Sequence, residues 1–274
     1  MFRKWMVFLL CTLLLFSSAL AEGELRGYSK ENGYVYVSFG RYPQVIDGGI
    51  PDDGTQAWSW RVSYQQNKVK GEMREEGIDP AAIEPTPILW RVLSVEEERA
   101  YLCTEYILFP HPLQENSGVY AKIGEDFGQT ELCAYLNSDF AKTAFTPEEL
   151  RMLLSYKTYG KIFLLSADDL KDKSMGFGTN KSRKAWATEY SIRACGGFVY
   201  QVSKGSPSPY WTRTQSTSHK NAGRCTKQDG DVGYYDATNP EEGVRPAVWL
   251  YLNGFDIESG SGTKTDPYVL VPKS

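Results

Sequence analysis

Histidine is scarce in this sequence: the 274 residues contain two, His111 and His219. The H-E-x-x-H pattern of a helical zinc site is absent, and no two cysteines stand in C-x-x-C spacing. The chain also lacks the G-x-S-x-G turn of serine hydrolases and the glycine-rich P-loop that holds phosphates. These absences exclude the common short motifs of catalysis, and we expect neither a metal nor a cofactor.

A basic surface is also lacking. Asp and Glu together number 34 against 30 Lys and Arg, which gives a formal net charge of −4. Proteins that bind nucleic acid through its phosphates carry an excess of positive charge. We therefore expect no nucleic-acid partner.

Long hydrophobic runs are lacking except at the start of the chain. Arg3 and Lys4 precede an apolar stretch from Trp5 to Phe16, and Ala19-Leu20-Ala21 then offers small residues for cleavage. This three-part pattern predicts a signal peptide over residues 1–21, because a membrane anchor needs about 20 apolar residues. We expect a secreted or periplasmic protein with no membrane span after cleavage.

Four cysteines remain after residue 21. In an exported chain an even number favours two disulfides, with the pairing left open. A free thiol at Cys195, which precedes two glycines, or at Cys225 is the alternative that a cysteine-dependent enzyme would require. The four are Cys103, Cys133, Cys195 and Cys225.

The sequence pattern from residue 34 to residue 166 predicts strands, then helices and a final short strand. Residues 34–44 alternate as a first strand, and 88–109 read as two strands joined by a charged turn at Glu96–Arg99. Apolar residues recur at helical spacing over 129–145, and Thr146 followed by proline and two glutamates predicts the start of another helix. Residues 161–166 (KIFLLS) predict a short buried strand.

The segment 172–239 is polar and broken by glycine and serine, yet it is rich in aromatic residues. A long irregular stretch of this kind is typical of a functional surface. Aromatic faces beside an arginine suit sugars or peptides. We therefore predict ligand contacts at Trp186, Tyr210, Trp211 and Arg213.

Nine short motifs stand in a fixed order along the chain. They are FGRYPQ, ILWRVL, AYLCTEYIL, LCAYLNSDFAKTAFTPEEL, KIFLLSADDL, ATEYSIRACGG, YWTRT, DGDVGYY and GVRPAVWLYL. This series resembles the bacterial family called domain of unknown function 6273, with YLN and YWTRT as departures from its usual WLN and WWLRS. The resemblance implies an α+β fold in one domain, with a mixed or antiparallel sheet, a few helices, long irregular segments and a C-type-lectin-like architecture.

The resemblance sets the expected organisation of the chain. A signal peptide (1–21) and a loose leader (22–33) precede the domain at 34–255, which carries an insertion at 45–87 and is followed by a tail at 256–274. The closing run at 243–252 is expected beside the first strand. Arg245 there should pair with a carboxylate, such as Asp139, Glu131 or Asp168, or with backbone carbonyls. Structural roles are expected for Arg245, Trp249, Trp90 and Asn137.

The family carries no activity that could be transferred, so function is argued from the residues alone. We expect a non-catalytic, exported binding module whose partner is an extracellular or envelope glycan or protein. Two alternatives stay open. One is a cysteine-dependent enzyme with the fold of sulfatase-modifying factors, and the other is a structural envelope protein.

Overall fold

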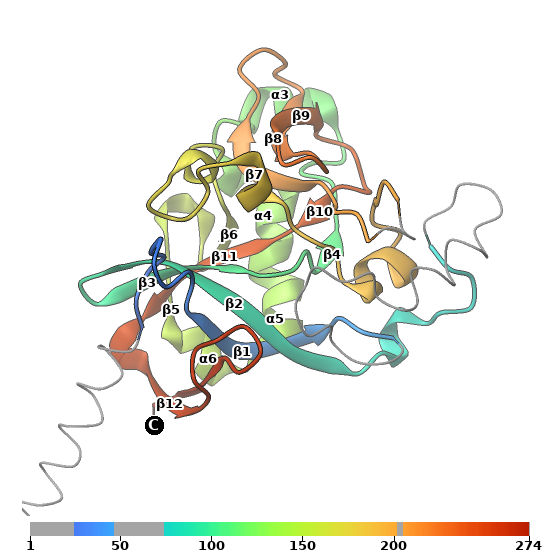
Figure 1. Cartoon of the computed structure of the whole chain (residues 1–274). Coiled ribbons are helices and arrows are strands. Elements are labelled where there is room, and N and C mark those ends of the chain that lie inside the picture. The colour runs from blue at the N-terminus through green and yellow to red at the C-terminus, as the bar shows by residue number, and fades with distance from the viewer. Residues whose placement is uncertain (1–24, 47–73, 202–204, 274) are drawn as a thin grey trace, which may run out of the picture.

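In the computed structural model, which describes residues 25–46, 74–201 and 205–273, the strands form two sheets (Figure 1). Within these ranges the larger sheet has eight strands, in the order β12-β13-β1-β2-β3-β11-β5, with β6 paired to β11 off this path. The smaller sheet has five, in the order β4-β10-β7-β8-β9. With the short helices between them, the sheets confirm the predicted α+β class.

The strands of the larger sheet are β1 (Tyr36–Pro43), β2 (Pro85–Glu96), β3 (Arg99–Thr104), β5 (Leu153–Leu154), β6 (Ile162–Leu164), β11 (Pro246–Tyr251), β12 (Phe255–Ser259) and β13 (Tyr268–Pro272). Those of the smaller sheet are β4 (Phe109–Pro110), β7 (Tyr210–Gln215), β8 (Ala222–Thr226), β9 (Val232–Asp236) and β10 (Gly243–Val244).

The helices of the described residues are short. The α-helices are α3 (Ser117–Ile123), α4 (Glu131–Tyr135), α5 (Ala141–Ala144), α6 (Pro147–Met152) and α7 (Asn180–Arg183). Single turns of other helix types are η1 (Pro80–Ala82), η2 (Phe127–Gln129), η3 (Leu136–Phe140), η4 (Lys157–Tyr159), η5 (Asp169–Lys171), η6 (Tyr190–Ala194) and η8 (Leu252–Gly254).

Several local predictions are confirmed. The strands β2 and β3 form the expected hairpin around Glu96–Arg99, and β6 covers the core of KIFLLS. Thr146 caps α6 with a complete capping box, in which its side chain accepts from the Glu149 N–H and the Glu149 side chain accepts from the Thr146 N–H. The apolar stripe at 132, 136, 140 and 144 forms one buried face over α4, η3 and α5.

The turn η3 is a π-helix, and it places Asn137 where its side chain can bond to another segment. Its Nδ2 donates to the carbonyls of Tyr159 (2.9 Å) and Ile162 (2.8 Å), and its Oδ1 accepts from the Lys161 N–H at 2.8 Å. Gly160 lies against this side chain with φ of 77°, so a Cβ there would collide with the Asn137 amide. Asn137 therefore fixes the path of residues 159–162.

The closing run connects the two sheets. Gly243–Val244 forms β10 of the smaller sheet, and Pro246–Tyr251 forms β11 in the interior of the larger one (Figure 1). The expectation that it lies beside the first strand is wrong: β11 pairs with β3, β5 and β6, whereas β1 pairs with β2 and β13. The reason is burial, because a run that is apolar at nearly every position needs neighbours on both edges and both faces.

The expected outer segments also differ from the structure. The described part of the leader is ordered around buried Leu25 and reciprocal Ser29–Gly33 hydrogen bonds. The expected tail supplies β12 and β13, and β13 runs parallel to β1. The signal peptide and residues 47–73 of the insertion lie outside the described residues. Among those described, no helix has the length and apolar character needed to cross a bilayer.

Candidate functional site

One face of the larger sheet carries a row of large polar and aromatic side chains. On β3 and β11, Tyr101 lies opposite Trp249 and Arg99 lies opposite Tyr251, so all four project from the same face. The Tyr101 and Trp249 rings stack with centroids 4.7 Å apart, and the Arg99 guanidinium lies 4.2 Å from the centre of the Trp249 ring. We call this surface the aromatic face.

A cleft of about 710 Å³ opens on the aromatic face. Leu154 lies opposite Trp249 in the β5–β11 pair and lines the cleft together with Tyr251. The rest of the lining is the β2–β3 turn, residues 96–99. Four of the six lining residues are therefore charged, three of them glutamates, and the other two are Leu154 and Tyr251.

An arginine–aspartate pair borders the stacked rings. Arg213 on β7 donates through Nη1 to Asp169 Oδ2 (2.9 Å), to the Leu164 carbonyl (2.5 Å) and to the Tyr101 hydroxyl (3.2 Å). Tyr101 in turn donates to Asp169 Oδ2 at 2.9 Å. The two charged side chains are 12% and 16% exposed, which places the pair at the edge of the interior.

Local hydrogen bonds hold the aspartate. Ser166 and Asp169 bond reciprocally, the Ser166 N–H donating to Oδ2 at 2.7 Å and the Ser166 hydroxyl accepting from the Asp169 N–H at 2.9 Å. Burial acts to lower the pKa of Arg213, but Tyr101 and Asp169 raise it above its usual value. Burial, and then Asp169, hold the pKa of Tyr101 well above its ordinary range. These shifts keep Arg213 charged and Tyr101 neutral at neutral pH.

Aromatic rings surround the guanidinium. Its central carbon lies 5.8 Å from the ring centre of Tyr156, 5.9 Å from that of Tyr159 and 5.8 Å from that of Phe163. Phe163 is buried in β6, while Tyr156, just before η4, and Tyr159, its last residue, are half-buried. We call Arg213, Asp169, Tyr156 and Tyr159 the Arg213 site.

The Arg213 site retains bonding capacity. Within the described residues, the side-chain hydrogen bonds of Arg213 all use Nη1 and those of Asp169 all use Oδ2. Arg213 Nε and Nη2 are thus two donors, and Asp169 Oδ1 is an acceptor, beside two tyrosine rings. Because the pair is electroneutral, the site presents directional polar groups with no net charge.

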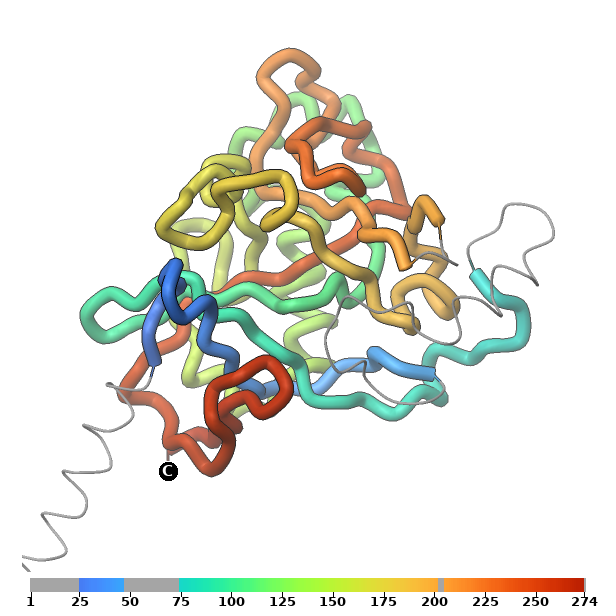
Figure 2. The backbone as a smooth tube through the Cα atoms, viewed as in Figure 1, coloured from blue at the N-terminus to red at the C-terminus, as the bar shows by residue number. Residues whose placement is uncertain are grey.

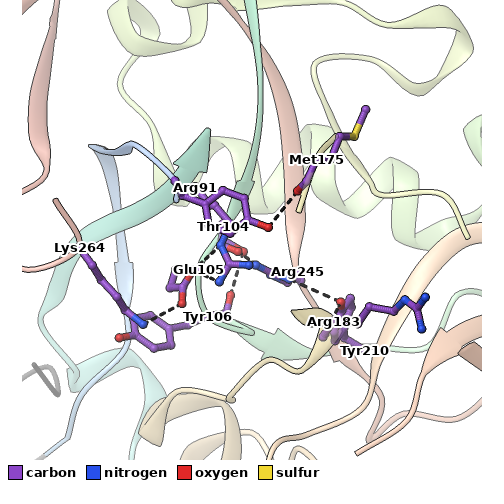
Figure 3. A network of polar contacts seen from close by, with 10 residues as sticks. Arg91, Thr104, Glu105, Tyr106, Met175, Arg183, Tyr210, Arg245 and Lys264 are labelled. Carbon is purple, nitrogen blue, oxygen red and sulfur yellow. Dashed lines mark hydrogen bonds and ion pairs between the residues drawn. The ribbon is translucent and has the colours of Figure 1, made fainter. Parts of the chain in front are cut away.

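A second polar cluster lies deeper, where the two sheets join (Figure 3). Glu105, which follows β3, accepts from Arg91 Nε at 2.8 Å through Oε2 and from Lys264 Nζ at 2.8 Å through Oε1. Burial acts to raise the pKa of Glu105, but Arg91 and Lys264 together bring it below its usual value. The Arg91 guanidinium also lies 4.3 Å from the centre of the Tyr34 ring.

Arg245 completes this deeper cluster. Its Nε donates to the Thr104 carbonyl at 2.5 Å, and its Nη1 lies 3.5 Å from the Tyr210 hydroxyl. Of the partners expected for it, the backbone carbonyl is observed, whereas Asp139, Glu131 and Asp168 each bond elsewhere or face solvent. The Tyr34 hydroxyl donates to the Met175 carbonyl at 2.9 Å, so the blue N-terminal turn and the yellow loop lie side by side (Figure 2).

The predicted ligand contacts do not come together. Tyr210 and Trp211 are 1% and 0% exposed, so their rings belong to the core, and the expectation of ligand contact there is corrected. Trp186 is half-buried, and its indole N–H donates to the Gly205 carbonyl at 2.8 Å. Arg213 alone of the four is part of the site. The strand alternation of YWTRT did not reveal which rings face inward.

Of the four residues expected to be structural, Trp90, Trp249 and Arg245 lie in the interior, whereas Asn137 is exposed and acts through its hydrogen bonds. Trp90 is fully buried, its indole N–H donates to the Phe39 carbonyl at 3.0 Å, and its ring stacks on Phe39. Trp249 is 7% exposed under Arg99. No sequence pattern predicted Tyr101, Tyr156 or Tyr159 as site residues. Asp169 could have been predicted from its position, because it is an acidic residue at the start of a helical turn soon after KIFLLS.

The four cysteines in the described part of the chain are free thiols, so the two disulfides predicted among them are not formed. Their surroundings differ: Cys133 donates to the Tyr159 carbonyl at 3.3 Å, and Cys103 faces the Arg245 cluster on β3. Cys225 lies beside buried Glu242, and Cys195 is half-buried beside Tyr190. Burial raises the pKa of the Cys195 thiol, which works against its use as a nucleophile.

Thiol titration tests this arrangement. In the protein lacking residues 1–21, a thiol-specific reagent should react with Cys195 well before the three buried cysteines, because accessibility limits the reaction. Four thiols should react after unfolding without reductant. The variant Cys195→Ser should lose the early signal and keep three. A count of two or none in the unfolded wild type would instead show disulfides.

The comparisons with known proteins identify the family. Residues 97–252 match the family described as Domain of unknown function (DUF6273), and the chain belongs to it. The matched region begins in the β2–β3 turn and ends after β11, so it contains the Arg213 site and, of the deeper cluster, Glu105 and Arg245 but not Arg91 or Lys264. Searches of curated proteins and of solved structures returned no match.

Proposed function

We propose that this protein is a non-catalytic binding module that recognises a neutral carbohydrate at the Arg213 site. The observation that carries the proposal is the set of free groups on an electroneutral pair: two donor nitrogens of Arg213 and one acceptor oxygen of Asp169. A sugar presents neighbouring hydroxyls that both accept and donate. A free anion would be drawn to Arg213 but repelled by Asp169, so the pair favours a neutral polar ligand.

The surroundings of the pair support the same ligand class. The half-buried rings of Tyr156 and Tyr159 offer apolar faces with polar edges, which suits the alternating character of a sugar ring. Hydrogen bonds through Asn137 and Tyr101 hold both charged and aromatic groups in place, so little ordering is needed on binding. The cleft beside Trp249 gives room on the same face for a ligand of more than one sugar unit.

This function agrees with an exported location, which we propose from the three-part pattern of residues 1–21. We also propose a C-type-lectin-like architecture for the domain, on the grounds that the closing strand lies inside the sheet and long irregular segments cover one side of it. The ligand would then be an extracellular or envelope glycan.

Binding measurements test the proposal. The full chain is screened on a glycan array, and the affinity of the best oligosaccharide is measured by calorimetry. Asp169→Asn removes the acceptor charge and should weaken binding about tenfold, as should Tyr156→Ala, since each loses roughly 1.4 kcal/mol. Thermal unfolding of each variant shows whether the fold is retained.

Asp168→Asn is the matched control. It makes the same chemical change one residue earlier, on an exposed side chain paired with Lys171 at 3.0 Å, and it should leave the affinity unchanged. Equal losses at both positions would contradict the Arg213 site. A wild type that binds no glycan, or that binds charged peptides instead, would contradict the proposed function.

A further inference from the structure

The guanidinium of Arg245 is enclosed and has few partners. The residue is 1% exposed. Its Nε bonds to the Thr104 carbonyl, whereas the Nη1 contact with Tyr210 is 3.5 Å long, the outer limit of a hydrogen bond. Its Nη2 is buried without a hydrogen-bond partner among the described residues. The edge formed by Nη1 and Nη2 is therefore a pair of parallel donors that can receive an acceptor from outside the protein.

Positive charge exceeds negative charge around this edge. Arg91, Lys264 and Arg245 surround one carboxylate, Glu105, and both oxygens of that carboxylate are engaged by Arg91 and Lys264. Burial keeps the Cys103 thiol neutral by raising its pKa, and burial raises the pKa of Tyr36 to about 12. Arginine stays protonated in proteins. Unbalanced buried charge is costly, so a further negative charge at this place stabilises the fold.

We propose that the Nη1–Nη2 edge of Arg245 binds a small inorganic anion, with chloride as the occupant. The side chains and backbone that enclose this edge are closed to solvent: Cys103 and Thr104 are fully buried and Tyr210 is 1% exposed. A monatomic anion is little larger than a water molecule, and it can accept from several N–H groups at once. An organic carboxylate or phosphate would need a larger cavity and a path into the interior.

The position of Arg245 gives such an ion a structural role. Arg245 is the single residue between β10 of the smaller sheet and β11 of the larger one. Its hydrogen bond reaches the end of β3, and its ring contact at 5.5 Å is with Tyr210 on β7. An anion held there would strengthen the junction of the two sheets. This role is independent of the Arg213 site and of glycan binding.

The test measures the thermal stability of the full chain against chloride concentration. Sodium chloride replaces sodium gluconate at constant ionic strength, so that general salt effects are held fixed. A ligand that binds only the folded protein should raise the Tm by about 3–5 °C for each tenfold rise in chloride above its dissociation constant. The variant Arg245→Met should lose this dependence.

Arg99→Met is the control, because Arg99 lies on the same sheet but is exposed, and it should respond to chloride like the wild type. Crystals of the wild type soaked in bromide give a second measurement that does not need the Arg245 variant to fold. An anomalous peak within hydrogen-bond distance of Arg245 Nη2 is expected. A Tm that is unaffected by chloride, or a position that holds only an ordered water in bromide-soaked crystals, would overturn the proposal.

Discussion

Replacing Glu105 with glutamine should lower the free energy of unfolding by about 3–5 kcal/mol, the usual effect of removing one partner from a buried ion pair. Glu105 is 5% exposed and bonds to both Arg91 and Lys264. Glutamine keeps the shape of the side chain but leaves the cations of the deeper cluster without a carboxylate. Urea unfolding at neutral pH measures the change.

Glu96→Gln is the matched control for this prediction. Glu96 also pairs with an arginine of the same hairpin, Arg99, at 2.8 Å, but both side chains are about half exposed (48% and 46%). Exposed pairs contribute about 0–1 kcal/mol, so this variant should be almost as stable as the wild type. If the two substitutions had equal effects, Glu105 would not be the carboxylate that balances the buried cluster.

The Glu105 cluster also explains why the C-terminal segment belongs to the domain. Lys264 stands between β12 and β13, beyond the residues that match the family, and its Nζ bonds to Glu105 in the interior. The parallel β1–β13 pair adds a second connection. The segment after residue 255 looks like a polar tail in the sequence. It is held in the domain by the Lys264–Glu105 ion pair and by the pairing of β13 with β1.

Local patterns made much of the fold predictable. The charged turn of 96–99, the capping box at Thr146 and the apolar stripe of 129–145 each depend on residues close in sequence. Such patterns determine where elements begin and end. They do not determine which strands pair, and the position of β11 was missed because its neighbours, β3, β5 and β6, come from three distant segments.

The candidate site was less predictable for the same reason. Arg213 was identified from its aromatic neighbours in the sequence, but the rings that surround it are Tyr156, Tyr159 and Phe163, from about fifty residues earlier. The adjacent Tyr210 and Trp211 turned out to be core residues. Composition shows that aromatic residues are abundant, whereas only the folded structure shows which of them face the polar pair.

A buried glutamate next to the smaller sheet has an unusually high pKa. Glu242 precedes β10 and is 1% exposed, and its Oε1 has no hydrogen-bond partner among the described residues. Its Oε2 accepts from Asn239 Nδ2 at 3.3 Å, and the Cys225 thiol lies beside it. Burial raises the pKa of Glu242 to about 8 from an ordinary value of 4.5, with Cys225 opposing the shift. The carboxyl group is therefore protonated in the folded protein at neutral pH.

The stability of the protein should consequently fall as the pH rises from about 4.5 to about 8. In this window the folded state holds a proton that the unfolded state has released, so the free energy of unfolding drops by about 1.4 kcal/mol per pH unit from this group. Below the window both states are protonated and the full stability is present. Above it both are ionised, and the contribution of Glu242 has been lost.

Glu242→Gln should remove this contribution, because a glutamine cannot ionise. The variant and the wild type should unfold alike near pH 4.5, and the variant should be more stable at pH 8 by on the order of 4 kcal/mol. Urea unfolding of both proteins across the range measures the difference, which cancels the titration of all other groups. Glu241→Gln removes only the smaller contribution of the exposed neighbour to the raised pKa of Glu242, so it should keep most of the pH dependence of the wild type. Parallel profiles for the wild type and Glu242→Gln would mean that Glu242 ionises in the folded protein much as it does in the unfolded chain, and that burial is relieved there by water.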